Sequence, residues 1–509
     1  MTAQSTRTLL SLLIAMAMLA FACGDGPRTG SATALDDPRA PADDRPPSDT
    51  PVEPANNTPN EPDEPIDDPQ DPPPEDPQEP EEDPQEPPDE PVEEPPVELS
   101  LGEPDWWVHI GNEERNALQA IAAGPQGHSA VLIQRIFANT PATIRSSITP
   151  DVVETSNQHL FRFDPEGRLQ SAINLPVYVK SMAMDNAQNL IVVGEINGGG
   201  ELGQERFEPS RRNVVIIKLG PDNAVRWVQT WDNNAYDDCH AVAVSDKDAV
   251  AVACEIDGRL TLAAYEPDGT VRFNRSYGPL YTSSSFSAVR SVVWHHATRL
   301  GIAGFSQSSL DMDGDGENEI IDRGASTAFV GVYDAQDGRH IWSKGAGGEL
   351  GTVAGHLDAA HSCAFDPAGN LIATLSIHGH AQFEGRTFGT PNERSRTDLI
   401  ASWNPDNGAL RWLHQAQGQL TSNANTGLRL LSGNTLQQLS PNTGLPIVTT
   451  HISPDILPPF SSAHLFEHND LYTFTLIEAD HGLAQELGLE VHQQPDAVLH
   501  RFSLIEVVP

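Results

Sequence analysis

Apolar and polar residues alternate in short runs along the chain after residue 101, which is the period of a β-strand. Each run ends in a turn, and in five of the six turns proline presets φ while a closing Gly or Asn accepts positive φ. The pattern therefore predicts a repeated strand–turn–strand unit and no helical period. The runs lie at 159–163, 214–219, 261–265, 328–333, 399–403 and 435–439, and their turns at 164–167, 220–223, 266–269, 335–338, 404–408 and 440–444.

A large aromatic residue follows the turn at a fixed distance in four of these six units. It stands four residues after the closing Gly or Asn, as Trp227, Phe273, Trp342 and Trp412, whereas Ser171 and Val448 fill the place in the other two. A constant offset indicates a packing anchor repeated on the outer strand, rather than separate binding sites.

A second hairpin precedes the first in each unit, for example 181–193 around the turn 185–189 and 363–375 around the turn 366–370. Four short antiparallel strands make the blade of a β-propeller. The strand 497–504 is a third strand with no fourth after it, and 106–109 has the look of a fourth strand with no blade before it. We therefore expect an all-β, seven-bladed β-propeller over residues 101–509, closed by its N-terminal strand pairing in the last blade.

Two parts of the chain resemble known repeats. The units at 305–342 and 360–412 resemble the SBBP-type β-propeller repeats of secreted and cell-surface bacterial proteins. The segments 333–342 and 403–412 are also similar to the tryptophan-docking repeat of quinoprotein-like propellers. Both resemblances imply the propeller fold, and a fold of this kind hosts unrelated activities.

Residues 23–100 differ sharply in composition from the rest. Between residues 24 and 100 the sequence has 25 acidic residues, three basic residues and 22 of the 42 prolines. Such a segment cannot bury enough apolar surface to fold, and charge repulsion and proline keep it extended. We expect a disordered stalk, either a spacer or a passive tail. The acidic excess of the whole chain, −42, argues against a nucleic-acid partner.

The first 22 residues have the form of a secretion signal, with Arg7 before an apolar run that is short for a membrane span. The run ends at Ala20-Phe21-Ala22-Cys23, which resembles a bacterial lipobox and implies a lipid anchor on Cys23. Ordinary signal-peptidase cleavage after Ala22 is the alternative.

Export favours disulfides. Cys239 and Cys254 flank a turn predicted at 245–248 and would face each other across a tight hairpin. We expect a cross-strand disulfide, with two buried thiols as the alternative and Cys363 left free.

Residues 311–322 place carboxylates in the order that binds a hard cation. Asp311, Asp313, Asp315, Glu319 and Asp322 occupy positions 1, 3, 5, 9 and 12, Gly316 occupies position 6, and Glu317 would offer its backbone carbonyl. We expect a structural Ca²⁺ site in a strand-flanked loop, with a solvated acidic loop as the alternative. His378 with His380, and His295 with His296, give only a weak zinc pattern because no further ligand stands at a recognisable distance.

The connections between second and third strands are long: 139–157, 197–213, 306–326, 378–397 and 478–494. In a propeller they all emerge on one face, where a protein or glycan ligand is expected to bind. With no catalytic motif in the sequence, the first hypothesis is a membrane-tethered, non-enzymatic binding or scaffold module of the cell envelope. A quinoprotein-like dehydrogenase and a subunit of an envelope assembly are the alternatives.

Overall fold

The computed structural model describes residues 96–100, 104–111, 116–135, 143–147, 158–196, 200–207, 213–231, 237–279, 288–321, 326–348, 358–389, 395–423, 427–452, 463–467, 470–477 and 496–503. The chain divides into two compact units, Met1–Pro88 and Asp89–Pro509, and every described residue belongs to the second. The predicted signal peptide, Cys23 and nearly all of the predicted stalk lie outside these residues. Within them, no helix is long and apolar enough to cross a membrane.

Six sheets are each formed by one continuous stretch of chain, and their strands are antiparallel. The first is β3 (Asn116–Ala123), β4 (Ser129–Arg135), β6 (Gln158–Phe163) and β7 (Leu169–Ile173), with the 3-10 turn η1 (Pro125–Gly127) between β3 and β4. The second is β8 (Tyr178–Met184), β9 (Leu190–Ile196), β12 (Asn213–Leu219) and β13 (Val225–Trp231). The third is β14 (Asp238–Val244), β15 (Val250–Ile256), β16 (Arg259–Tyr265) and β17 (Val271–Pro279).

The remaining three continue the series. They are β18 (Ala288–His295), β19 (Arg299–Ser306), β20 (Thr327–Asp334) and β21 (His340–Ala346); then β22 (Ala359–Phe365), β23 (Leu371–His378), β26 (Arg396–Trp403) and β27 (Leu410–Gln415); then β28 (Gln419–Asn423), β29 (Gly427–Ser432), β30 (Thr435–Leu439) and β31 (Pro446–His451). Two small hairpins, β10 (Gly200–Leu202) with β11 (Glu205–Phe207) and β24 (Ala381–Phe383) with β25 (Arg386–Phe388), extend from the second and fifth sheets.

A further sheet combines both ends of the described chain. It has β32 (Ala463–Glu467), β33 (Asp470–Ile477) and β34 (Asp496–Ser503), followed by β2 (Trp106–Gly111) and β5 (Thr143–Ser146). β2 pairs antiparallel with β34, so that Trp107 lies opposite His500. The predicted pairing of the N-terminal strand with the terminal strand is thus confirmed. The predicted count of seven blades is corrected, because six sheets are blades of four consecutive strands and the remaining sheet is a composite of five strands that includes β5.

The predicted boundary of the stalk at residue 100 is also wrong. β1 (Val97–Ser100) pairs in parallel with β31 and adds a fifth strand to that sheet. The alternation of Val97, Glu98, Leu99 and Ser100 is that of a strand, although it directly follows the proline-rich stretch.

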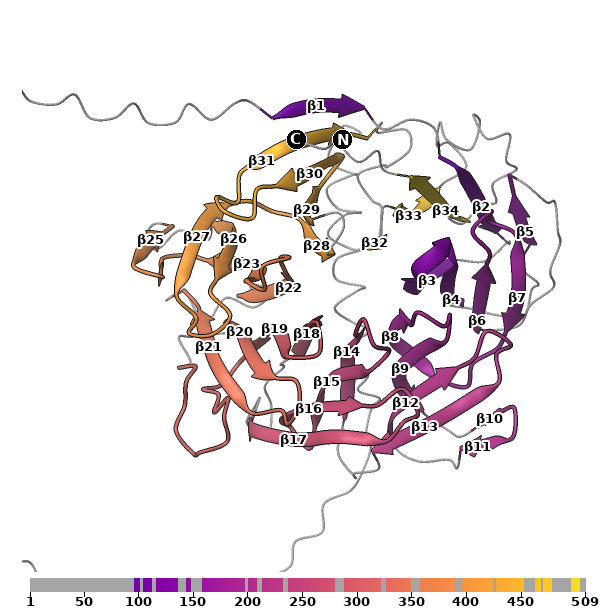
Figure 1. Ribbon diagram of the computed structural model, residues 1–509, viewed down its shortest axis with the longest axis horizontal. Coiled ribbons are helices and arrows are strands. Elements are labelled where there is room, and N and C mark those ends of the chain that lie inside the picture. Colours follow the sequence, from indigo (N-terminus) through magenta and orange to yellow (C-terminus); the bar gives the residue numbers. More distant parts are fainter. Residues whose placement is uncertain are drawn as a thin grey trace, which may run out of the picture. The chain divides into compact units, whose positions relative to one another are not determined.

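The first strands of successive sheets contact one another around a common centre (Figure 1). β3 contacts β8, β8 contacts β14, and the series continues through β18, β22, β28 and β32 back to β3. Buried apolar side chains fill the spaces between neighbouring sheets, for example Val332 and Trp342 with Leu371 and Trp403. The described residues therefore form an all-β propeller.

The four repeated aromatic residues link the second, third, fourth and fifth sheets each to the sheet that follows, which confirms the predicted packing anchor. The indole Nε1 of Trp227 donates to the carbonyl oxygen of Pro267 at 3.1 Å, Trp342 to Pro405 at 2.9 Å, and Trp412 to Pro441 at 3.1 Å. Each ring lies on the turn glycine of the next sheet, where a Cβ atom would come within 2.5–2.8 Å of the indole. Glycine is therefore required there both for its positive φ and for this contact.

Cys239 and Cys254 are joined by a disulfide across β14 and β15, with their Cα atoms 4.1 Å apart. The turn between these strands is one residue longer than predicted, because the amide of Ser245 bonds to the carbonyl of Ala249. A β-bulge at His240 absorbs the extra residue and restores Cys239 opposite Cys254.

Candidate functional site

The acidic loop between β19 and β20 is anchored by apolar side chains. Leu310 and Ile320 exchange two backbone hydrogen bonds, of 2.8 and 3.2 Å, at the neck of the loop. Both side chains and that of Met312 are buried in the core between the third and fourth sheets. The Tyr333 hydroxyl also donates to the carbonyl of Met312 at 3.1 Å. The loop is therefore held at its base while its acidic residues project outward.

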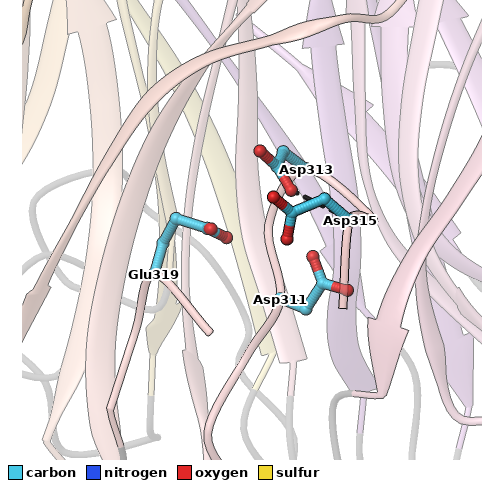
Figure 2. A group of neighbouring side chains, drawn as sticks. All are labelled: Asp311, Asp313, Asp315 and Glu319. Atoms are coloured by element: carbon cyan, nitrogen blue, oxygen red, sulfur yellow. Dashed lines mark hydrogen bonds between the residues drawn. The ribbon is translucent and has the colours of Figure 1, made fainter. Parts of the chain in front are cut away.

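Four carboxylates of this loop converge on a common space (Figure 2). The candidate ligand oxygens of Asp311, Asp313, Asp315 and Glu319 all lie within 4.8 Å of one another. Backbone amides orient them: Gly314 and Gly316 donate to the two oxygens of Asp311 at 2.6 and 3.0 Å. Gly314 and Gly316 both have positive φ, which allows the tight turn that brings alternate side chains to one side.

The charges of this cluster repel one another. Burial and the charges of Asp313 and Asp311 raise the pKa of Glu319. An all-oxygen donor set with excess negative charge suits a hard cation such as Ca²⁺, which takes six to eight oxygens. The residues present therefore fit such an ion.

Of the six residues predicted as metal ligands, the structure brings these four together. Glu317 is outside the cluster, and its amide donates to Asp315 at 2.8 Å. Asp322 lies outside the described residues. Among the residues described, this is the one group of three or more acidic, histidine or cysteine side chains close enough to share a metal.

The histidine pairs do not assemble as zinc ligands. Nδ1 of His378 lies 3.2 Å from Asp358, whereas His295 packs on the ring of Phe365 and His296 lies 3.4 Å from Asp246.

A central cavity of about 480 Å³ lies between the first strands of the sheets. Strands β3, β8, β14, β18, β22 and β28 all contribute to its wall, which mixes alanine, valine and methionine with polar side chains. Its volume is in the range of small-molecule sites. The polar residues include Arg290, His361, Ser362, Gln419, Thr421 and Ser422.

Five first strands carry a β-bulge at the equivalent position, which the sequence analysis missed. The pairing with the second strand skips one residue in each, namely Gln119, Lys180, His240, Arg290 and His361. A bulge re-aims one side chain and is common beside active sites. The signal in the sequence is a polar residue followed by Ala or Ser, four or five residues before the strand ends.

These bulges lie toward one end of the central cavity. Because the four strands of a sheet run antiparallel, the start of the first strand, the link between sheets and the connection from second to third strand share one face. Each bulge lies within the first four residues of its strand. The bulge residues, the acidic loop and the β10–β11 and β24–β25 hairpins therefore belong to the face on which ligand binding was predicted. The long connection 478–494 is outside the described residues.

On one side of the ring the bulge residues are neutralised by acids. Lys180 lies 3.0 Å from Glu195 and 3.1 Å from Asp238, and Nε2 of His240 lies 2.9 Å from the same Asp238 oxygen. Burial works against the charge of Asp238, but the hydrogen bond from His240 and the charge of Lys180 outweigh it and hold its pKa well below the ordinary value. Burial likewise lowers the pKa of Lys180, but Asp238 and Glu195 more than offset this and leave it raised.

Comparison with known proteins gives likeness of fold. No protein family model and no curated protein matches the sequence. Among solved structures, BamB from Moraxella catarrhalis is 12% identical, covers 76% of this chain and 99% of its own, and has a TM-score of 0.36. Virginiamycin B lyase from Staphylococcus aureus is 8% identical over 79% of this chain and 100% of its own, with a TM-score of 0.40. Quinohemoprotein alcohol dehydrogenase from Comamonas testosteroni is 10% identical over 80% and 78%, with a TM-score of 0.37. Similarity at this level carries no argument about activity.

Proposed function

We propose that this chain is an exported, lipid-anchored protein whose propeller is a non-enzymatic binding module of the cell envelope. In this proposal residues 1–22 direct export, Cys23 carries the lipid, and the acidic proline-rich stalk spaces the propeller from the membrane. The composite sheet acts as the seventh blade and closes the ring. The cavity between the first strands supports the binding role, because polar side chains from β18, β22 and β28 line it and paired strands frame it.

Calcium is part of this proposal. Asp311, Asp313, Asp315 and Glu319 would supply most of its ligands, with Asp322 and the carbonyl of Glu317 completing the shell. The ion would neutralise mutually repelling carboxylates and fix the long connection between β19 and β20. Its role would be structural, since the loop is anchored to the core through Leu310, Met312 and Ile320.

Fractionation of expressing cells tests the tether. The full chain is expected in the membrane fraction with a mass increase from acylation of Cys23, whereas Cys23→Ser is expected in the soluble exported fraction. The matched control Cys363→Ser leaves the anchor intact. Equal partition of the full chain and Cys23→Ser would contradict the proposed anchor.

A quinoprotein-like dehydrogenase is the second candidate, favoured by one observation: an arginine, Arg290, lies on the wall of the central cavity. The acidic cluster does not line that cavity, and its described lining residues include no carboxylate. Absorption spectra and mass spectra of the purified full chain, before and after incubation with a quinone cofactor, distinguish a dehydrogenase from a binding module. A stoichiometric organic cofactor would overturn the binding-module proposal.

A further inference from the structure

Arg290 differs from the bulge residues Lys180 and His240 because no acid among the described residues forms an ion pair with it. Lys180 and His240 share Asp238, but Arg290 makes no ion pair within the described part of the chain. Its guanidinium carbon lies 5.0 Å from the ring centre of Phe305, and its Nη1 makes a hydrogen bond with His361. The side chain is exposed and lies on the wall of the central cavity, where a ligand in the cavity can reach it. The protein around it lowers its pKa by partial desolvation.

His361 does not supply that partner charge. Nη1 of Arg290 lies 3.3 Å from Nδ1 of His361, and since arginine can only donate, Nδ1 accepts. The proton of the neutral ring is then on Nε2, which donates to the hydroxyl of Ser376. Burial, together with the charges of Arg290 and Arg396, lowers the pKa of His361 to about 4, so the ring is neutral at neutral pH. It orients the guanidinium and leaves the other donors of Arg290 for a ligand.

The neighbouring polar groups hold the frame around this pair. Ser291 and Ser362, which follow the two bulge residues, accept hydrogen bonds from the amides of Cys363 and Leu420, each 3.2 Å away, on the next first strand. These bonds link β18 to β22 and β22 to β28. The wall that carries Arg290 and His361 is therefore fixed in place before any ligand binds.

An acid near His361, Asp398, is paired with another arginine. A side cavity of about 160 Å³ adjoins His361 and contains Arg396 and Asp398, whose Nε and Oδ1 atoms are 2.7 Å apart. Arg290 thus keeps a local positive charge in a chain whose net charge is −42. The planar fork of a guanidinium matches two oxygens of a carboxylate or phosphate group.

We propose that Arg290, positioned by His361, binds the oxyanion group, carboxylate or phosphate, of a small ligand in the central cavity. This rests on the proposed binding function and assigns a chemical class to its ligand. The cavity volume allows a metabolite-sized molecule. The oxyanion would take the place that Asp238 occupies beside Lys180 and His240.

Binding of two probes to the purified full chain tests the proposal: succinate for the carboxylate arm and inorganic phosphate for the phosphate arm, each by isothermal titration at constant ionic strength. We expect saturable binding of at least one. Arg290→Gln should weaken it about tenfold or more, because a hydrogen bond to a charged group contributes about 1.5–3 kcal/mol. Arg290→Lys, which keeps the charge and loses the fork, should bind with intermediate affinity. Arg226→Gln, which removes an arginine from the exposed Asp222 pair, is the matched control and should bind within about twofold of the natural chain.

The outcomes distinguish a failure of the oxyanion site from a failure of the proposed binding function. Absence of binding of both probes, or equal affinity of Arg290→Gln and the natural chain, overturns the oxyanion site. If Arg290→Gln fails to fold, as judged by circular dichroism, Arg290→Lys alone decides, because it preserves the contact with Phe305. A glycan and peptide array on the same full chain tests the broader proposal independently. If the array yields ligands but neither probe binds, the propeller is a binding module with a different site. If neither assay yields a ligand, both the oxyanion site and the binding-module proposal are contradicted.

Discussion

The indole nitrogen of Trp106 donates a hydrogen bond to the carbonyl oxygen of Pro165 at 3.0 Å. This is the same contact that Trp227, Trp342 and Trp412 make with the proline of the following sheet. The ring of Trp106 also lies on Gly167, where a Cβ atom would come within 2.6 Å of it. The N-terminal strand β2 therefore packs the composite sheet against the first continuous sheet through the same tryptophan–proline contact that Trp227, Trp342 and Trp412 make.

Substitutions at Trp106 measure how much this docking stabilises the ring. Trp106→Phe keeps most of the packing and loses the hydrogen bond, so we expect a loss of about 1 kcal/mol in the free energy of unfolding. Trp106→Ala opens a cavity and should cost about 3–5 kcal/mol in urea unfolding. Its neighbour Trp107 points to the opposite face of β2 and is less buried, so Trp107→Ala is the control with the smaller loss. Equal losses in the free energy of unfolding for Trp106→Ala and Trp107→Ala would show that the contact with Pro165 and Gly167 does not contribute more to stability than ordinary burial.

Calcium is expected to raise the unfolding temperature of the natural chain. At a concentration one hundred times the dissociation constant the gain would be about 2.7 kcal/mol. The double variant Asp313→Asn with Asp315→Asn should lose this gain, and without calcium it should be no less stable than the natural chain, since two repelling charges are removed. Differential scanning calorimetry with and without calcium measures both effects.

The control for that experiment removes two exposed acids elsewhere. Glu201→Gln with Glu205→Gln, on the β10–β11 hairpin, should keep the full response to calcium. Magnesium should give a smaller shift, because it requires a tighter octahedral shell than four protein carboxylates supply. The same shift in both double variants would argue for non-specific screening.

A buried ion pair offers a third test. Nζ of Lys218 lies 2.8 Å from Asp185, with both side chains almost fully buried, and it also donates to the carbonyl of Pro267 in the next sheet at 3.1 Å. Asp185→Asn leaves a buried ammonium without its counter-charge and should cost about 3–5 kcal/mol. Asp222→Asn breaks the exposed pair with Arg226 and should leave the urea midpoint unchanged. Comparable effects of the two substitutions would mean that Lys218 finds another partner.

Acid should destabilise the propeller before its carboxylates are fully protonated. Burial lowers the pKa of His500 to about 4, and that of His361 is lowered to the same value, whereas unfolded histidine titrates near 6.5. Between these values the unfolded chain holds more protons than the folded chain, so stability falls as pH drops from about 6.5 to about 4. Urea midpoints at pH 7, 5.5 and 4.5 measure this slope. His500→Gln should have a shallower slope than the natural chain. An unchanged slope in His500→Gln would show that His500 does not contribute to the pH dependence of stability.

The turns and aromatic anchors could be predicted because each has a strict local requirement. Gly269 and Gly408 have positive φ and lie beneath an indole, so both their chemistry and their spacing are visible in the sequence. The added strands β1 and β5 could not be predicted in the same way, because each has four residues and its pairing partner lies far away in the sequence.

The bulges could not be predicted from alternation alone. Opposite a regular second strand, an extra residue such as His240 changes the register without interrupting the apolar pattern. Cys239 was predicted opposite Cys254 from a turn that is in fact longer, and the bulge compensates for that difference. Arg290 on the cavity wall is also a bulge residue. The candidate site therefore could not be predicted from the alternation of apolar and polar residues, which does not show the bulge.

Because β2 completes a sheet whose third strand is β34, the order of synthesis constrains how this protein matures. β2 leaves the ribosome before the six continuous sheets, yet Leu499, the partner of Val108, is made after all of them. One edge of β2 can pair with β5 soon after synthesis, but the other edge must wait for β34 until the six continuous sheets have been made, and this long-range step is expected to be late and slow. Chains released early would expose an unsatisfied edge at β2, which makes the seam the point at which quality control can distinguish complete molecules from truncated ones.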